Sequence, residues 1–248
     1  MNRFGINTIA FKDELTRGAQ QIEYISKIKL FNVEVLEIRR EFLNEKYLLT
    51  ELTELKMEAE KQNVTLFYSV NDELFQIEGL NPQIKDYVKE ALLLNAERIK
   101  FNFGYYQTEL SIEEINVLTE LTANSPKINI ENNQTVEHCN LVNMEKFLIE
   151  CKTNQIPINF CFDLANWLWT GTEVQHAIDK LKDYTDYVHL KNYKNEGIEL
   201  VVTSLAGGKL SWEKYLNQFH SNIDLTLEYN GSNKMIEEDL RLLRLNEK

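Results

Sequence analysis

The sequence predicts a single (β/α)8 barrel, the TIM-barrel fold, over residues 1–248. Short apolar runs rich in Ile, Val, Leu and Phe alternate with helix-like patterns eight times along the chain. Successive apolar runs are centred roughly thirty residues apart, which is the length of one strand–helix unit. No linker rich in Pro, Gly or Ser interrupts the alternation, and 248 residues are enough for one barrel domain.

The predicted strands and helices follow one another in strict order. The strands are centred near Ile6, Leu36, Leu66, Ile99, Ile130, Phe160, Val188 and Leu227. The helical patterns cover residues 14–30, 44–62, 81–95, 111–123, 140–153, 173–182, 211–220 and 233–245. The second pattern is the clearest, because one of its faces carries Leu48, Leu52, Leu55 and Ala59. Two of the helices are expected to begin after N-cap serines, Ser111 and Ser211.

A doubly wound open sheet is the other fold in which strands and helices alternate. Such a sheet usually has a glycine-rich turn after its first strand. The corresponding segment of this chain, NTIAFKDEL, contains no glycine. The closed barrel is therefore the predicted architecture.

Charge and composition limit the classes of partner that the protein is expected to bind and the compartment in which it is expected to work. The net charge is −12, from 39 acidic and 27 basic residues, which argues against a nucleic-acid partner and an anionic membrane surface. The sequence shows no signal peptide or membrane-spanning run, and its three cysteines form no CxxC motif. We expect a reduced, cytoplasmic protein with a small-molecule substrate. A homodimer or homotetramer is compatible with the sequence.

Four polar residues stand at the ends of four consecutive predicted strands, the fifth to the eighth: Glu131, Asp163, His189 and Glu228. Active sites of (β/α)8 barrels lie at the carboxyl ends of the strands, so these side chains are expected to lie side by side. Three carboxylates and one imidazole would form an oxygen-rich site for a divalent metal. Each residue alone has a structural explanation: a core histidine, an aspartate that caps a turn, or a glutamate paired with a lysine or arginine.

The same residue types suit a defined chemistry. Moving a proton between carbons next to a carbonyl creates an enediolate, whose charge a divalent ion stabilises while it orients the substrate. Carboxylates on either side can remove the proton and return it. Three carboxylates and a neutral imidazole leave coordination positions open for the substrate, unlike a closed structural zinc site.

Five segments in order resemble the xylose-isomerase-like superfamily of TIM barrels, which includes sugar phosphate isomerases and epimerases: VEVLEIRREF, INIENNQT, FDLANWLWTG, YVHLKNY and LTLEYNG. The resemblance covers most of the chain. It implies that Glu131, Asp163, His189 and Glu228 bind one Mn²⁺, Mg²⁺ or Co²⁺ ion in preference to Zn²⁺. It also implies that Glu131 and Glu228 act as acid and base on opposite faces of the substrate.

Six further residues are candidates for contact with the substrate: Glu37, Arg39, Glu137, Asn166, Lys191 and Trp167. Glu137 matches a substrate-contacting glutamate of ketose epimerases in the same superfamily. Asn166 stands where many members have a histidine, and no arginine follows His189 in its loop, so the sequence departs from the ketohexose 3-epimerases. The other candidates also have structural explanations, such as an ion pair between strand residues or packing of an aromatic ring in the barrel wall.

The sequence therefore predicts a metal-dependent isomerase or epimerase of a sugar or sugar phosphate, working through an enediolate. Two alternatives stay open: a keto-inositol-type dehydratase on the same scaffold, and a metal- or sugar-binding barrel without turnover. An AP endonuclease is excluded, because that related barrel uses several zinc ions and many histidines, whereas this acidic chain has four histidines.

The connection from Asn192 to Leu210 is the longest between a predicted strand and the helix that follows it. It lies on the predicted active-site side and contains Gly207-Gly208, a candidate hinge. We expect this connection to act as a lid, with a rigid loop in a dimer interface as the alternative.

Overall fold

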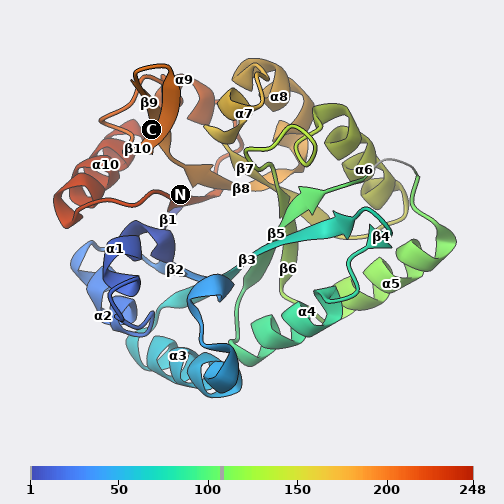
Figure 1. Ribbon diagram of the computed structural model, residues 1–248, viewed down its shortest axis with the longest axis horizontal. Helices are drawn as coiled ribbons and strands as arrows, with labels where there is room; N and C mark the ends of the chain where they lie inside the picture. Colours follow the sequence, from blue (N-terminus) through green and yellow to red (C-terminus); the bar gives the residue numbers. More distant parts are fainter. Residues whose placement is uncertain (1, 107–108, 248) are drawn as a thin grey trace.

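Eight parallel strands form a closed barrel in the computed structural model, which describes residues 2–106 and 109–247 (Figure 1). Their order around the barrel is β2-β1-β11-β8-β7-β6-β5-β3, and pairing of β2 with β3 completes the circle. The strands are β1 (Arg3–Asn7), β2 (Val35–Arg39), β3 (Thr65–Gln76), β5 (Arg98–Gly104), β6 (Lys127–Glu131), β7 (Ile158–Asp163), β8 (Thr185–Leu190) and β11 (Asp224–Leu227). The predicted (β/α)8 barrel is confirmed.

Helices surround the strands on all sides (Figure 1). The α-helices are α1 (Lys12–Leu15), α2 (Glu23–Leu30), α3 (Leu48–Gln62), α4 (Ile84–Leu93), α5 (Ile112–Ala123), α6 (Leu141–Thr153), α7 (Asn166–Trp169), α8 (Val174–Leu181), α9 (Trp212–Leu216) and α10 (Asn233–Asn246). Short 3-10 helices are η1 (Thr8–Phe11), η2 (Arg40–Phe42), η3 (Glu45–Tyr47) and η4 (Lys182–Tyr184). Ser111 caps α5 in a reciprocal capping box with Glu114. Ser211 does precede α9, but its hydroxyl caps no N–H of the described residues.

The structure corrects the prediction of one continuous helix over residues 14–30. The chain instead forms α1, a turn, and then α2, because Gly18 adopts a left-handed backbone conformation with φ of +101°. A further feature was not predicted: β3 continues beyond the barrel and pairs with β4 (Gly79–Leu80) in an antiparallel hairpin.

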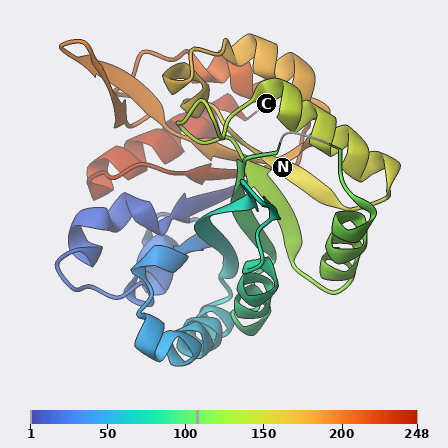
Figure 2. The same ribbon diagram turned by 45° about the vertical axis from the view of Figure 1, so that its right-hand side comes forward.

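The predicted lid region begins with a second antiparallel hairpin, β9 (Asn192–Glu196) and β10 (Glu199–Thr203), which projects from the barrel (Figure 2). Ile198 at its tip is 99% exposed. The Gly207-Gly208 segment is held in place, because the Asn192 amide donates hydrogen bonds to the carbonyls of Leu205 and Leu210. A β-carbon on Gly208 would lie 2.0 Å from the Asn192 side chain, so this glycine permits close packing and is poorly suited as a hinge.

Charged side chains fill the amino-terminal end of the barrel. Arg98 is buried between the rings of Phe67 and Tyr187, with its guanidinium carbon 5.1 Å from each ring centre. Its nitrogens lie 2.6 Å from Asp224 and 3.0 Å from Asp186. We call this group of charges, together with Arg3 and Glu97, the basal plug.

None of the helices in the described ranges is long and apolar enough to cross a membrane.

Candidate metal centre

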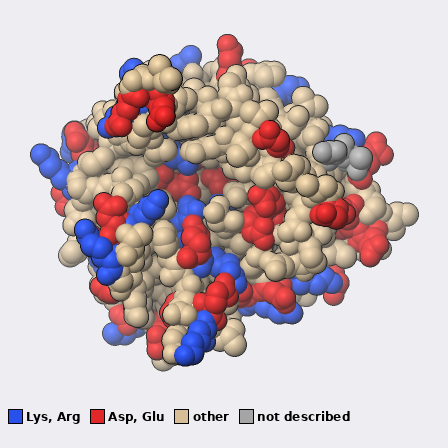
Figure 3. All heavy atoms as spheres, viewed as in Figure 1, with Lys and Arg blue, Asp and Glu red and all other residues tan. Residues whose placement is uncertain are grey.

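The carboxyl end of the barrel brings together the four residues expected to bind a metal. Glu131 and Asp163 are the last residues of β6 and β7, His189 lies in β8, and Glu228 follows β11. All four are buried, and one candidate ligand atom from each lies within 4.8 Å of all the others. Parallel strands of adjacent register place them there, because Asp163 pairs directly with His189. On this face, acidic and basic side chains gather around a central hollow (Figure 3).

Each carboxylate of the centre has one oxygen held by a fixed partner. Oε2 of Glu131 lies 2.6 Å from the ammonium nitrogen of Lys100 on β5. Oε1 of Glu228 accepts a hydrogen bond of 2.9 Å from Arg39. Oδ1 of Asp163 accepts two backbone N–H bonds at the start of α7, which is the turn cap considered from the sequence. These contacts orient the carboxylates and leave the other oxygen of each for the centre.

The other oxygen of each carboxylate and one imidazole nitrogen face the centre. We call them the inward atoms: Oε1 of Glu131, Oδ2 of Asp163, Nδ1 of His189 and Oε2 of Glu228. Nδ1 lies 2.6 Å from Oε1 of Glu131 and 3.4 Å from Oε2 of Glu228. The ammonium group of Lys191 lies 2.7 Å from Oδ2 of Asp163 and 2.8 Å from Oε2 of Glu228. Each of the three inward oxygens therefore faces a nitrogen that can carry a proton.

A second set of contacts fixes the imidazole of His189. Its Nε2 lies 2.8 Å from Oε2 of Glu37, a buried carboxylate that also accepts hydrogen bonds from Asn7 and Tyr187. With the Nε2–H donating to Glu37, Nδ1 is directed at the centre as a ligand. Histidines that bind metals commonly have such a carboxylate partner. Glu37 was a candidate for contact with the substrate, with an ion pair between strand residues as the alternative, and in the structure its carboxylate contacts His189.

Burial and neighbouring charges shift the protonation of the centre. Burial alone would raise the pKa of Glu131, but Lys100 and His189 outweigh it and lower the pKa to about 2. Burial raises the pKa of Asp163 to about 6, and Lys191 offsets only part of this effect. Glu228 keeps a pKa well below its usual value despite its burial, owing to His189 and Lys191. Two of the three carboxylates are thus firmly ionised.

The residues present fit a divalent cation. Oδ2 of Asp163 is buried and makes no hydrogen bond of acceptable geometry with any described residue, although the Lys191 ammonium is in ion-pair contact. Three carboxylate oxygens and one imidazole nitrogen are a donor set for Mn²⁺, Mg²⁺ or Co²⁺. Cys161 also adjoins Glu131 and His189, but burial raises the pKa of its thiol to about 12, so it stays protonated.

The structure brings some of the predicted substrate residues to the centre and leaves others away from it. Arg39 and Lys191 both contact Glu228. Asn166 is buried beside Asp163, and its amide donates to the carbonyl of Asn132 while its own oxygen has no partner among the described residues.

Two predicted contacts are not supported. Glu137 is exposed in the loop after β6 and is not among the residues whose ligand atoms gather at the centre. Trp167 is fully buried, and its indole packs against Phe160 and Phe162. The short helix α7 turns this ring into the core, so Trp167 is a packing residue and not a wall of the site.

Lys100 was missed by the sequence analysis, although a signal for it exists. In the strand RIKFNFG, the polar residues Arg98, Lys100 and Asn102 alternate with Ile and Phe. Alternation places all three on one face, and in a barrel strand covered by helices that face is the interior. Lys100 is 2% exposed, which is unusual for a lysine unless it is paired.

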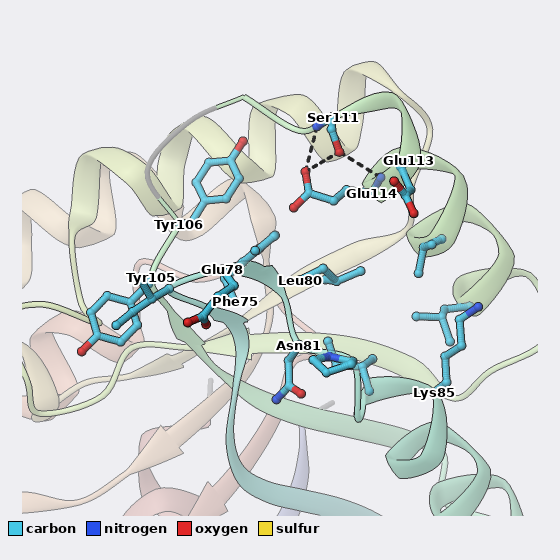
Figure 4. Close-up of a pocket in the computed structure, with 16 residues that line it drawn as sticks. Phe75, Glu78, Leu80, Asn81, Lys85, Tyr105, Tyr106, Ser111, Glu113 and Glu114 are labelled. Carbon is cyan, nitrogen blue, oxygen red and sulfur yellow. Dashed lines mark hydrogen bonds between the residues drawn. The ribbon is translucent and has the colours of Figure 1, made fainter.

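A separate cavity lies outside the barrel, between the β3–β4 hairpin, α4 and the start of α5 (Figure 4). Its volume is about 740 Å³, and its wall includes Phe75, Leu80, Tyr105 and Tyr106. The described residues that line it include no member of the metal centre.

Neither a protein-family model nor a curated protein matches the sequence. Solved structures match its fold over nearly the whole chain. The probable 3-DHS dehydratase AsbF of Bacillus anthracis matches with a TM-score of 0.69 at 13% identity, covering 98% of both chains. The 3-keto-D-glucoside 4-epimerase YcjR of E. coli gives 0.68 at 12% identity, covering 99% of this chain and 100% of that one.

An AP endonuclease of family 2 from Brucella melitensis also matches, with a TM-score of 0.67 at 14% identity and 99% coverage of both chains. Proteins with such different titles share one architecture, so the likeness defines the fold and leaves the reaction to be argued from the site. The chain has the fold of the xylose-isomerase-like TIM barrels, as its motifs predicted.

Proposed function

We propose that this barrel is a divalent-metal-dependent isomerase or epimerase of a sugar or sugar phosphate. One observation carries the proposal: Glu131 and Glu228 approach the imidazole of His189 from two different strands, at 2.6 and 3.4 Å. Two carboxylates next to one metal centre can both reach the same carbon atom of a substrate. One can then remove a proton and the other can return it.

Glu131, Asp163, His189 and Glu228 would hold the ion through their inward atoms. The bound ion would supply charge stabilisation and would orient two neighbouring oxygens of the substrate. The outward contacts from Lys100, Arg39 and the start of α7 keep the carboxylates in position. Burial of the four residues keeps water away from a developing enediolate.

The proton transfer itself is assigned to the two glutamates. The ammonium of Lys100 keeps the pKa of Glu131 low, and so maintains the ionised form that a base requires. Glu228 is kept ionised by His189 and Lys191 in the same way. The substrate would be a small polyol-derived ketone or aldehyde. A nucleic-acid substrate is disfavoured by the net charge of −12 and by the single histidine in the metal-capable groups of the described residues.

A dehydratase of a keto-inositol-type substrate is the second candidate, supported by the fold likeness to the probable dehydratase AsbF. The same carboxylates could remove the proton and let a neighbouring hydroxyl leave. A barrel that binds a metal or sugar without turnover is the third.

One experiment separates these candidates. The purified protein is analysed for bound metals, loaded with Mn²⁺, and incubated in D₂O with ketoses, aldoses, their phosphates and inosose-type ketones. An isomerase or epimerase incorporates deuterium beside the carbonyl and conserves the skeleton, whereas a dehydratase releases water and lowers the product mass. A protein that binds no divalent metal, or binds it and exchanges no proton in any substrate, would refute the proposed function.

A further inference from the structure

The ammonium group of Lys191 occupies a bridging position between two of the four candidate ligands. It lies 2.7 Å from Oδ2 of Asp163 and 2.8 Å from Oε2 of Glu228, and both oxygens are inward atoms. We propose that Lys191 is an internal cation that neutralises the centre before metal loading and is exchanged for the divalent ion. This inference rests on the proposed function, because it requires that the centre bind a metal.

The geometry favours exchange, because the ammonium already occupies the space in front of the two oxygens that the ion would use. A divalent ion coordinated by these oxygens at about 2.0–2.3 Å would stand within a few ångströms of the ammonium nitrogen. Two cations at such a separation repel each other strongly in a buried site. The lysine must therefore leave the oxygens when the ion arrives.

The charges around the centre point the same way. Four buried carboxylates face three cations at this end of the barrel. The carboxylates are those of Glu37, Glu131, Asp163 and Glu228, and the cations are those of Arg39, Lys100 and Lys191. These cations offset three of the four carboxylate charges. Adding a divalent ion to all three would overcompensate the carboxylates unless a cation withdrew. Lys191 is the cation of this group whose ammonium touches inward atoms.

Lys191 also has a route out of the centre. It directly follows the end of β8, and its side chain is 9% exposed, so it reaches the edge of the buried cluster. After exchange the ammonium would lie at the mouth of the centre, where an anionic or hydroxyl group of a substrate could take it as a new partner.

Lys100 provides the internal contrast. Its ammonium contacts Oε2 of Glu131, the outward oxygen, while the inward Oε1 faces His189. A metal can bind Oε1 without displacing Lys100, whose side chain is only 2% exposed. Two lysines in one centre thus have different roles: Lys100 positions a ligand, and Lys191 competes with the ion.

The test is a titration of the metal-stripped protein with Mn²⁺, followed by calorimetry and by the electron paramagnetic resonance of free Mn²⁺. For Lys191→Met we expect tighter binding by at least about tenfold, because the competing cation is gone. Lys191→Arg retains the charge and should bind Mn²⁺ no more tightly than the parent. Lys100→Met should not tighten binding by more than about threefold, which excludes a general effect of removing one positive charge.

Stability provides a second readout that does not depend on affinity. Without metal, Lys191→Met leaves two buried carboxylates without their shared cation, so its Tm in EDTA should fall and its rise on adding Mn²⁺ should exceed that of the parent. If Lys191→Met folds only with metal, it is purified with Mn²⁺, and its release of the ion to a chelator should be slower than from the parent.

The outcomes separate this inference from the proposed function. If the parent binds Mn²⁺ and Lys191→Met binds it equally or more weakly, the exchange is wrong and the metal centre stands. If neither protein binds Mn²⁺, Co²⁺, Mg²⁺ or Zn²⁺, both the centre and the exchange are wrong.

Discussion

The two ends of the barrel both bury charged side chains, but they do so in opposite ways. In the basal plug, Arg3 makes two hydrogen bonds of 2.8 Å to Glu97, and Arg98 is enclosed by two aromatic rings and two aspartates. At the other end, the carboxylates of the metal centre share lysines and a histidine, and Oδ2 of Asp163 lacks a well-oriented donor among the described residues.

This difference separates a structural cluster from a functional one. The basal arginines are paired through planar guanidinium groups, which match carboxylates closely and bind little else. At the carboxyl end of the barrel, which we call the upper end, the carboxylates outnumber the lysine and arginine side chains that contact them. These carboxylates retain unused acceptor capacity, as expected of a site that receives another cation. The carboxyl end of a (β/α)8 barrel carries function and the amino end carries stability. The predictions below test this division of roles.

The largest expected effect is on turnover, from replacing Glu131 or Glu228 by Gln at the upper end. The amide keeps the shape of the side chain but cannot act as a base, and it is a poorer metal ligand. We expect activity to fall by at least about a thousandfold and metal content to decrease. Steady-state kinetics and metal analysis measure both. Activity within about tenfold of the parent would contradict the acid–base assignment, provided that circular dichroism shows an intact fold.

Arg98→Met in the basal plug is expected to lower stability and to leave metal binding unchanged, the opposite of the two glutamate substitutions. This substitution removes the guanidinium that contacts both Asp224 and Asp186, although Arg3 still pairs with Asp224 and Asn129 still donates to Asp186. The free energy of unfolding should fall by about 1.5–3 kcal/mol, the usual loss of hydrogen bonds to a charged group. Urea denaturation measures the loss. Mn²⁺ affinity of the folded variant should match the parent. A change in affinity as large as that caused by Glu228→Gln would show that the two ends are not separate.

The sequence predicted one end of the barrel better than the other. Glu131, Asp163, His189 and Glu228 were found because each stands where an apolar strand ends, a position that packing does not explain. The basal plug and Lys100 were missed, because a charged residue inside a strand is recognised only when its alternation partners are read together, as for Arg98, Lys100 and Asn102. Pairing partners on distant strands cannot be read from one strand.

Side-chain direction was the other limit. Trp167 follows Asp163 closely in sequence, yet α7 turns the indole into the core. Glu37 was expected to face the substrate and instead faces His189, because both point into the barrel interior from strands that are not neighbours. Sequence spacing predicts which end of a strand a residue occupies but not which neighbour it meets. The interruption of the predicted helix over residues 14–30 could not be predicted either, because it depends on the backbone conformation of Gly18.

A smaller effect is expected at the β9–β10 hairpin, the predicted lid at the carboxyl end of the barrel. Because Asn192 holds the base of the connection, we expect motion in residues 193–203 and not at Gly207-Gly208. Hydrogen exchange with and without a bound sugar measures it. Residues 193–203 should gain protection while 204–210 stay unchanged. Equal exchange in both states would refute the lid and favour the rigid-loop alternative.

The smallest expected effect comes from Glu97→Gln in the basal plug, and its size depends on pH. The hydrogen bond from Arg3 lowers the pKa of Glu97 from its usual 4.5, although burial opposes the shift. A carboxyl whose pKa is lowered by folding stabilises the native state above about pH 4.5 and loses that contribution as pH falls.

Glu97→Gln should therefore be less stable than the parent at pH 7, by less than about 1 kcal/mol because Glu97 is partly exposed and solvent screens its charge. The difference should shrink steadily as the pH is lowered below 4.5, and urea denaturation at pH 7, 5 and 3 measures it. Mn²⁺ binding at pH 7 is the matched control and should not change. A stability difference that stayed constant between pH 7 and pH 3 would mean that Glu97 contributes by packing and not by charge. The charge contribution of the basal plug would then come from Arg3 and Arg98 with the two aspartates.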